Sequence, residues 1–179
     1  MSQLTTNWYV ITGGPSAGKT KTLEHLSYRG YKVIAEAARI LIDNELSRGK
    51  TLEQIRSDER QFQEKILDMK IMTEERLNPE ERLFLDRGIP DSIAYYRLNG
   101  ADPDPIIELA SNRIYKAVFL LEQLPFQKDG ARIENADSAQ RINDLLYQAY
   151  SELGSRIITV PVMSIADRAD FILARIEHS

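Results

Sequence analysis

Eight consecutive residues, 13–20, carry the clearest chemical signal in the chain and read Gly-Gly-Pro-Ser-Ala-Gly-Lys-Thr. They match the phosphate-loop pattern G-x-x-x-x-G-K-[ST] at every fixed position. Glycine at positions 13, 14 and 18 lets the backbone curl so that several N–H groups point at one anion. A helix that begins directly after the loop adds the positive end of its dipole. The pattern therefore predicts a site for the phosphates of a nucleotide.

Two side chains of this loop have their own predicted roles. Lys19 is expected to reach the β- and γ-phosphates, and the Thr20 hydroxyl is expected to hold Mg²⁺. The predicted cofactors are accordingly ATP and Mg²⁺. The expected cofactor-binding residues are Gly13, Gly14, Pro15, Ser16, Ala17, Gly18, Lys19 and Thr20, together with Arg132 further along the chain.

A carboxylate follows the next predicted strand, at the edge where open α/β sheets bind ligands. Glu36 stands there, at the start of a predicted helix, with Arg39 one turn further on. The carboxylate of Glu36 could accept the proton of an attacking hydroxyl or hold a substrate. Alternatively, it could complement the helix dipole and pair with Arg39 at the surface.

A second acidic position follows the apolar run 82–85. Asp86 ends this predicted strand, and in phosphate-loop proteins such an aspartate commonly anchors Mg²⁺. Arg87 follows, where many hydrolases have an acidic residue that activates water, so the pattern favours transfer over hydrolysis. Asp91 is expected at the mouth of the same site, or alternatively as the cap of a helix over residues 92–98.

The polar, turn-rich stretch 124–132 predicts a mobile flap, with a lid segment over about residues 123–137. Arg132 would neutralise charge in the transition state when the flap closes, and Arg141 lies behind it. Exposed arginines without a catalytic role are the alternative for both.

The elements that position these residues follow from hydrophobic periodicity. Short apolar runs predict strands at 8–12, 31–34, 82–86, 117–121 and 156–161. Helical spacing predicts helices at 19–29, 35–46, 51–77, 92–98, 106–112, 138–153 and 165–176, with 51–77 either one helix or two. This alternation predicts a single domain over residues 1–179, with a three-layer α/β/α fold and a parallel sheet of about five strands.

The amino-acid composition further restricts the classes of protein to which the chain can belong. The 179 residues carry a net charge of −4 and no cysteine, which excludes disulfides, thiolate metal sites and cysteine nucleophiles. Lys and Arg are scattered along the chain, so a nucleic-acid partner is disfavoured. No apolar run reaches the roughly twenty residues of a transmembrane helix, and the N-terminal residues do not resemble a signal peptide. A cytoplasmic location is therefore expected, while the oligomeric state stays open.

Missing motifs narrow the choice of nucleotide-binding protein. The chain has no N-K-x-D or T-K-x-D guanine-reading sequence, and it has Ile89 where switch GTPases usually have glycine. The L-S-G-G-Q signature of transporter ATPases is also absent. A small kinase remains, which transfers the ATP γ-phosphate to a nucleoside-, nucleotide- or similar small-molecule acceptor. The alternative is a nucleotide-binding regulator with a protein or lipid partner and little phosphotransfer.

Three segments beyond the phosphate loop carry a family resemblance: residues 33–39, residues 85–87 with Asp91, and residues 124–132. With the loop, they resemble the compact phosphate-loop ATPase/kinase family, classed among AAA domains, that includes the bacterial ribosylnicotinamide kinase domain. That kinase usually has tryptophan where Phe126 stands, and it is fused to an adenylyltransferase domain that these 179 residues do not contain.

The resemblance implies that Glu36 and Asp91 face the substrate, that Asp86 is a metal ligand or base, and that Arg132 is a lid arginine. Together with the motif analysis it gives three predicted sets. The catalytic residues are Lys19, Glu36, Asp86 and Arg132, the substrate-binding residues are Glu36, Arg39, Arg87, Asp91 and Phe126, and the metal ligands are Thr20 and Asp86.

Overall fold

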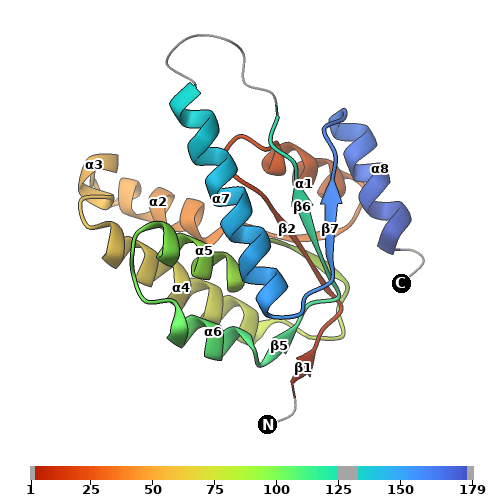
Figure 1. The fold of residues 1–179 in the computed structure, drawn as a ribbon, viewed down its shortest axis with the longest axis horizontal. Coiled ribbons are helices and arrows are strands. Elements are labelled where there is room, and N and C mark those ends of the chain that lie inside the picture. Colours follow the sequence, from red (N-terminus) through yellow and green to blue (C-terminus); the bar gives the residue numbers. More distant parts are fainter. Residues whose placement is uncertain (1–2, 125–132, 177–179) are drawn as a thin grey trace.

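A computed structural model of the chain describes residues 3–124 and 133–176. Its centre is a five-stranded sheet in the order β3-β4-β2-β6-β7, in which every neighbouring pair is parallel. The strands are β2 (Trp8–Thr12), β3 (Lys32–Ile34), β4 (Leu83–Asp86), β6 (Ala117–Leu121) and β7 (Ile157–Val160). Helices cover both faces of the sheet (Figure 1), which confirms the predicted three-layer α/β/α fold.

The central strand β2 is buried along its whole length because both of its faces are apolar. Tyr9 and Ile11 pack in the cluster beneath α1 (Lys19–Tyr28) and α8 (Ile165–Ile176). Trp8 and Val10 point to the opposite face, where they join a cluster with Tyr150. Successive side chains of β2 thus point alternately into the apolar clusters on the two faces of the sheet.

The opposite face carries most of the remaining helices (Figure 1). There α5 (Pro90–Leu98) packs against α7 (Ile133–Glu152), and α6 (Asp104–Ala110) adds to the same apolar cluster. Beside them, α4 (Glu59–Arg76) contacts α5 and also packs against α2 (Ala37–Ser47), while α3 (Leu52–Ile55) precedes α4. Residues of α2 and α4, and Arg56 directly after α3, border the site described below.

Helix boundaries follow local capping chemistry. Thr51 and Gln54 form a capping box that begins α3, and the Asp58 side chain caps α4, so residues 51–77 form two helices. Pro90 stands at the first turn of α5, which therefore begins two residues before the predicted start. Helix α7 begins at Ile133 instead of residue 138, so residues 133–137 of the predicted lid are helical.

A second, two-stranded parallel sheet joins β1 (Leu4–Thr5) to β5 (Arg113–Ile114) and was not predicted. Strands of two residues have no detectable period, so hydrophobic patterning could not indicate them. Among the described residues no helix is long and apolar enough to cross a membrane.

The buried strand β2 allows a direct test of this packing. Ile11→Ala should lower the free energy of unfolding by about 2–5 kcal/mol, because Ile11 is fully buried between two neighbouring strands and the lost side chain leaves a cavity. Ile40→Ala is the matched control, since Ile40 is 40% exposed on α2, and it should change stability by no more than about 0.5 kcal/mol. Urea denaturation of both variants measures the difference, and equal losses would contradict the arrangement.

Candidate active site

The turn from β2 into α1 has a backbone that requires glycine. Gly13 and Gly18 have φ angles of +149° and +84°, in the region that side chains rarely adopt. A Cβ on Gly13 would lie 2.9 Å from the Leu121 carbonyl oxygen, and a Cβ on Gly14 would lie 2.8 Å from the Ala139 carbonyl oxygen. The loop is thus pressed between β6 and α7, and its shape is set by tertiary contacts as well as by its own sequence.

Lys19 folds back over this loop. Its Nζ donates to the Gly14 carbonyl oxygen at 3.3 Å, while the Gly14 N–H donates to Asn143 Oδ1 at 3.1 Å. Burial, followed by the nearby Arg87 charge, lowers the pKa of Lys19 to about 8. Thr20 is exposed in the first turn of α1, so its hydroxyl is accessible beside the loop. Of the other loop residues, Pro15 and Ser16 are exposed and Ala17 is buried.

Asp86 ends β4, directly beside Ile11 of β2. Its Oδ1 is buried without a hydrogen-bond partner. Burial and the nearby Glu36 carboxylate raise the pKa of Asp86 to about 6. A carboxylate oxygen without a donor is the kind of ligand that Mg²⁺ prefers, and Mg²⁺ usually takes only one or two protein carboxylates together with substrate phosphates. Asp86 and Thr20 therefore fit the donor set of a nucleotide-bound Mg²⁺.

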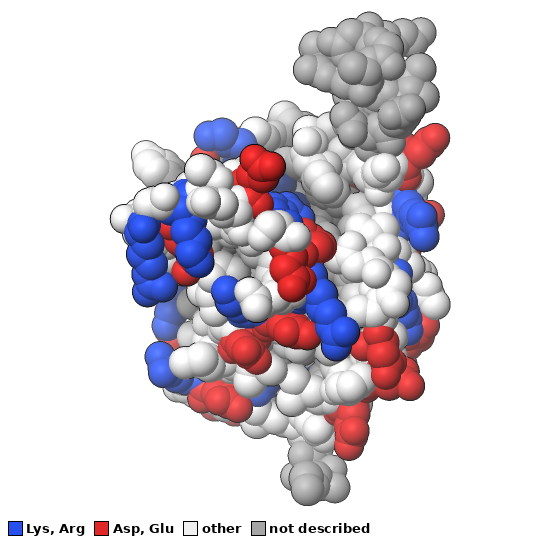
Figure 2. Space-filling view, turned by 90° about the vertical axis from the view of Figure 1, so that its left-hand side faces the viewer, with Lys and Arg blue, Asp and Glu red and all other residues white. Residues whose placement is uncertain are grey.

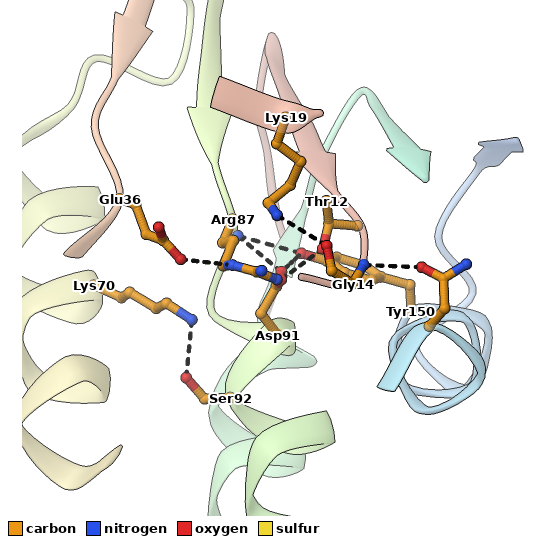
Figure 3. Close-up of polar contacts among 11 residues, drawn as sticks. Thr12, Gly14, Lys19, Glu36, Lys70, Arg87, Asp91, Ser92 and Tyr150 are labelled. Atoms are coloured by element: carbon orange, nitrogen blue, oxygen red, sulfur yellow. Dashed lines mark hydrogen bonds and ion pairs between the residues drawn. The ribbon is translucent and has the colours of Figure 1, made fainter. Parts of the chain in front are cut away.

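Arg87 pairs with two carboxylates. Its φ of +67° is unusual for a residue with a side chain, and its N–H donates to the Ile11 carbonyl oxygen at 3.1 Å. Its Nε donates to Glu36 Oε1 at 2.7 Å, and its Nη1 donates to Asp91 Oδ1 at 2.9 Å (Figure 3). Glu36 thus pairs with Arg87 inside the site and not with Arg39, which is exposed on α2.

The sequence predicted Asp91 at the mouth of the site, and this is wrong. Asp91 lies in the interior with no exposed surface. It also does not occupy the N-cap position of α5, which belongs to Ile89. Besides Arg87, it accepts hydrogen bonds from the Thr12 hydroxyl at 2.6 Å, the Gly88 N–H at 3.1 Å and the Tyr150 hydroxyl at 2.5 Å.

These partners explain how a carboxylate can be ionised in the interior. Burial alone would raise the pKa of Asp91, but Arg87, Lys70 and the hydroxyls of Thr12 and Tyr150 together lower it. Because all four direct partners donate hydrogen bonds, the negative charge is matched on every side. Asp91 therefore links the end of β2, the β4–α5 connection and α7 around one charge.

A cleft of about 140 Å³ lies beside Glu36 and Arg87, which form part of its wall. Its walls combine apolar, aromatic and charged side chains from α2, α4 and α5. The lining residues are Glu36, Ala38, Ile42, Arg56, Phe62, Gln63, Ile66, Lys70, Arg87 and Tyr95. Arg56 lies 4.8 Å above the Phe62 ring, and Arg87 lies 5.4 Å from the Tyr95 ring, so each aromatic wall carries a cation.

Lys70 enters this cleft from α4. It is only 6% exposed, and its Nζ donates to the Ser92 hydroxyl at 3.1 Å (Figure 3). Burial lowers its pKa. One turn along α4, the buried Glu74 binds Arg113 at 2.6 Å and Tyr115 at 2.9 Å, which ties α4 to β5 and the segment after it.

The outer surface on the side of α2 and α3 is mixed in charge. Figure 2, turned to show that side of the molecule, has acidic and basic side chains interspersed and no broad area of one sign. Arginine–glutamate pairs such as Arg56–Glu59 at 2.8 Å and Arg60–Glu64 at 3.1 Å belong to α4 and its start.

The structure brings together four predicted site residues, namely Lys19, Glu36, Asp86 and Arg87, whose charges act on one another. Arg39 and Arg141 are exposed, and Arg39 is not among the residues that line the cleft. Phe126 and Arg132 fall within residues 125–132, outside the described part of the chain.

Several residues of the site were not found from the sequence. Thr12, Lys70, Ser92 and Tyr150 each lie in an ordinary strand or helix pattern, and their partners are distant in the chain. Gln63 was also missed, because only the structure shows that this polar residue of α4 is buried, with 5% exposure.

The parallel sheet with a glycine-rich loop between β2 and α1 defines the class of the domain, a phosphate-loop fold. A family model described as an AAA domain matches residues 8–168, and the chain belongs to this family. A search of the curated proteins found no significant match.

Solved structures of similar fold include nucleoside and nucleotide kinases. Deoxyadenosine kinase from M. mycoides, with dCMP and dCDP bound, has a TM-score of 0.67 at 16% identity over 96% of this chain and 100% of that one. Thymidylate kinase from Ehrlichia chaffeensis has a TM-score of 0.65 at 15% identity over 97% and 99% of the two chains. The NadR protein in complex with NR has a TM-score of 0.68 at 12% identity over 98% of this chain, which spans 50% of NadR.

The charge matching around Asp91 can be tested by replacement. Asp91→Asn should lower the free energy of unfolding by about 3–5 kcal/mol, because it leaves the buried Arg87 with one carboxylate partner fewer. Tyr150→Phe removes a single hydroxyl from the same carboxylate and should cost less, about 1–3 kcal/mol. Urea denaturation measures both, and an Asp91→Asn loss smaller than that of Tyr150→Phe would contradict the central role of the charge.

The raised pKa of Asp86 predicts a pH dependence of stability. The pKa is about 6 in the folded chain against an ordinary value of 3.8, so between these values the folded state binds more protons and stability falls as pH rises. Without added Mg²⁺, Asp86→Asn should therefore be more stable than the natural chain near neutral pH, by up to about 3 kcal/mol. The gain should shrink toward pH 4. Urea denaturation with a chelator at both ends of this range checks it, and a pH-independent difference would refute it.

Proposed function

We propose that this protein is an ATP- and Mg²⁺-dependent kinase that transfers the γ-phosphate to a small nucleoside- or nucleotide-type acceptor. One observation carries the proposal: the Glu36–Arg87 ion pair, 2.7 Å long, lies between the phosphate loop and a cleft of about 140 Å³. The kinases among the structures of similar fold support it.

On the nucleotide side, the loop N–H groups and Lys19 would bind the phosphates, with Thr20 and Asp86 holding Mg²⁺. When bound, the metal neutralises phosphate charge during transfer. Lys19 is poised for this role, because its ammonium donates to a neutral carbonyl, that of Gly14. An anionic phosphate at the loop would be a stronger partner and would favour the protonated amine that burial disfavours.

On the acceptor side, Glu36 would accept the proton of the attacking hydroxyl. Arg87 engages Oε1 of Glu36 and holds the carboxylate in place at the border of the cleft. Positioning of this kind contributes strongly to phosphoryl transfer, in which the protein performs little covalent chemistry. Because Arg87 stands directly after Asp86 and faces the cleft, the position used by many hydrolases to activate water is occupied by a cation.

The composition of the cleft supports an acceptor with a planar ring. Phe62 and Tyr95 supply aromatic walls and Ile66 an apolar one, and the volume suits a single ring system with part of a sugar. Gln63 and Lys70 offer polar contacts within the same cleft and would fix the orientation of the ring. Gln63 is already held by Glu59, to which its amide donates at 2.9 Å.

The remaining predicted residues enter this proposal in other ways. Asp91 would act by holding Arg87 and the end of β2 in place, because both of its carboxylate oxygens are engaged by the protein. Arg132 and Phe126 are proposed as lid residues from the sequence alone. A role of the exposed Arg39 in substrate binding would require the acceptor to extend beyond the cleft.

The proposal is tested by ATP consumption with Mg²⁺ across nucleosides, nucleoside monophosphates and nicotinamide riboside. We expect one acceptor class to raise the rate well above the Lys19→Ala variant, whose loop has lost its phosphate contact. Lys21→Ala is the matched control, since Lys21 lies two residues further, has a side chain that is 67% exposed and forms an ion pair with the exposed Glu24. ATP binding without acceptor-dependent turnover would favour the regulator with a protein or lipid partner.

Glu36→Gln then tests the role of the base. With the acceptor identified, kcat should fall about 10²- to 10⁴-fold, because the amide cannot accept the proton. Acceptor KM should change little, since the amide keeps the size of the side chain and its hydrogen bond from Arg87. Unchanged kcat would show that Glu36 is not the base.

A further inference from the structure

Arg168 in α8 is an unusual charged residue, because it is 1% exposed and its hydrogen bonds to the described residues all go to backbone oxygens. Its Nη1 donates to the Ala17 carbonyl, its Nη2 to the Glu122 carbonyl at 3.1 Å and its Nε to the Pro161 carbonyl at 3.2 Å. Within the described residues, no carboxylate forms an ion pair with it. All three hydrogen bonds of Arg168 thus go to main-chain carbonyls, while the Glu122 carboxylate acts on its charge without forming an ion pair.

The three carbonyls belong to three separate segments around the phosphate loop. Ala17 is part of the loop itself, Glu122 follows β6 and Pro161 follows β7. The backbone N–H of Glu122 also donates to the Val160 carbonyl at 3.0 Å, so the ends of β6 and β7 are joined beside the guanidinium. One side chain therefore connects the phosphate loop to the two strand ends next to it.

The contact with the loop is close enough to restrict its sequence. A Cβ on Gly18 would lie 3.0 Å from Arg168 Nη1. Gly18 is therefore required both by its φ of +84° and by the guanidinium packed against it. Arginine suits this place because its planar fork presents several donors in fixed directions, whereas the ammonium of lysine is a point charge on a flexible stem.

We propose that Arg168 is a positioning residue for the nucleotide, which holds the phosphate loop in its binding shape before the nucleotide arrives. The proposal rests on the proposed function only in requiring that the loop binds ATP. By fixing the Ala17 carbonyl, Arg168 orients the peptide between Ala17 and Gly18, and hence the Gly18 N–H and the first turn of α1. It also brings a positive charge behind that turn, where it adds to the helix dipole.

The geometry separates this role from the acceptor side. Glu36 and Arg87 are held through Asp91, which is bound by residues of β2, α7 and the β4–α5 connection. The hydrogen bonds of Arg168 within the described chain go to Ala17, Glu122 and Pro161, and none goes to Glu36, Arg87 or Asp91. Its loss should therefore weaken ATP binding and leave the cleft unaltered.

The test is calorimetric titration of Mg·ATP and of pyrophosphate into the natural chain, Arg168→Lys, Arg168→Ala and Arg29→Ala. Arg29→Ala is the matched control, because Arg29 joins α1 to α8 by a surface ion pair with Asp170 at 2.5 Å and does not touch the loop. We expect Arg168→Ala to weaken both ligands by at least about tenfold, Arg168→Lys to fall in between, and the control to stay within about twofold.

Added guanidinium ion should restore much of the lost affinity to Arg168→Ala and none to the control, an effect that general destabilisation would not produce. If Arg168→Ala does not fold, Arg168→Lys alone decides the test. Equal affinity of the Arg168 variants and the natural chain would overturn the proposal, and so would a natural chain that binds neither ligand. ATP binding that depends on Arg168, without transfer to any acceptor, would instead overturn the kinase function alone.

Discussion

The charge of the buried Asp91 carboxylate underlies the interaction on which the Glu36–Arg87 pair depends. A charge without solvent is tolerated only when donors surround it, and here Arg87 and the hydroxyls of Thr12 and Tyr150 meet that requirement. Each donor comes from a different part of the fold. Hydrogen bonding to this one carboxylate therefore holds the end of β2, the β4–α5 connection and α7 together. Because Arg87 is fixed in this way, the position of the Glu36 carboxylate is fixed as well.

Arg168 has the complementary role on the nucleotide side. Where Asp91 is an anion surrounded by donors, Arg168 is a cation surrounded by main-chain acceptors. The phosphate loop begins at the end of β2, beside Thr12, and ends against Arg168. Its two ends are therefore held by two oppositely charged side chains, each buried. This explains how a glycine-rich segment with little side-chain packing of its own can keep a defined shape.

The fold and the loop could be predicted from the sequence because both depend on local patterns. The strands are short apolar runs, and the loop motif occupies eight consecutive residues. Three features of the site could not be predicted, because the residues involved lie in separate elements. They are the pairing of Glu36 with Arg87, the burial of Asp91 and the contact of Arg168 with Ala17. The starts of the helices could be predicted only in part. Pro90 could have indicated where α5 begins, whereas no capping residue indicates the start of α7 at Ile133.

The position after Asp86 shows how tertiary structure decides the meaning of a sequence signal. From the sequence alone, an arginine at this position favours transfer over hydrolysis, because no acidic residue follows Asp86. In the folded chain Arg87 has a further consequence, since its side chain forms ion pairs with both Glu36 and Asp91. The carboxylate next to the cleft is thereby supplied by α2 and held by β4. Because β3 and β4 are neighbouring strands, the Glu36 carboxylate and the Arg87 guanidinium that follow them meet at the border of the cleft.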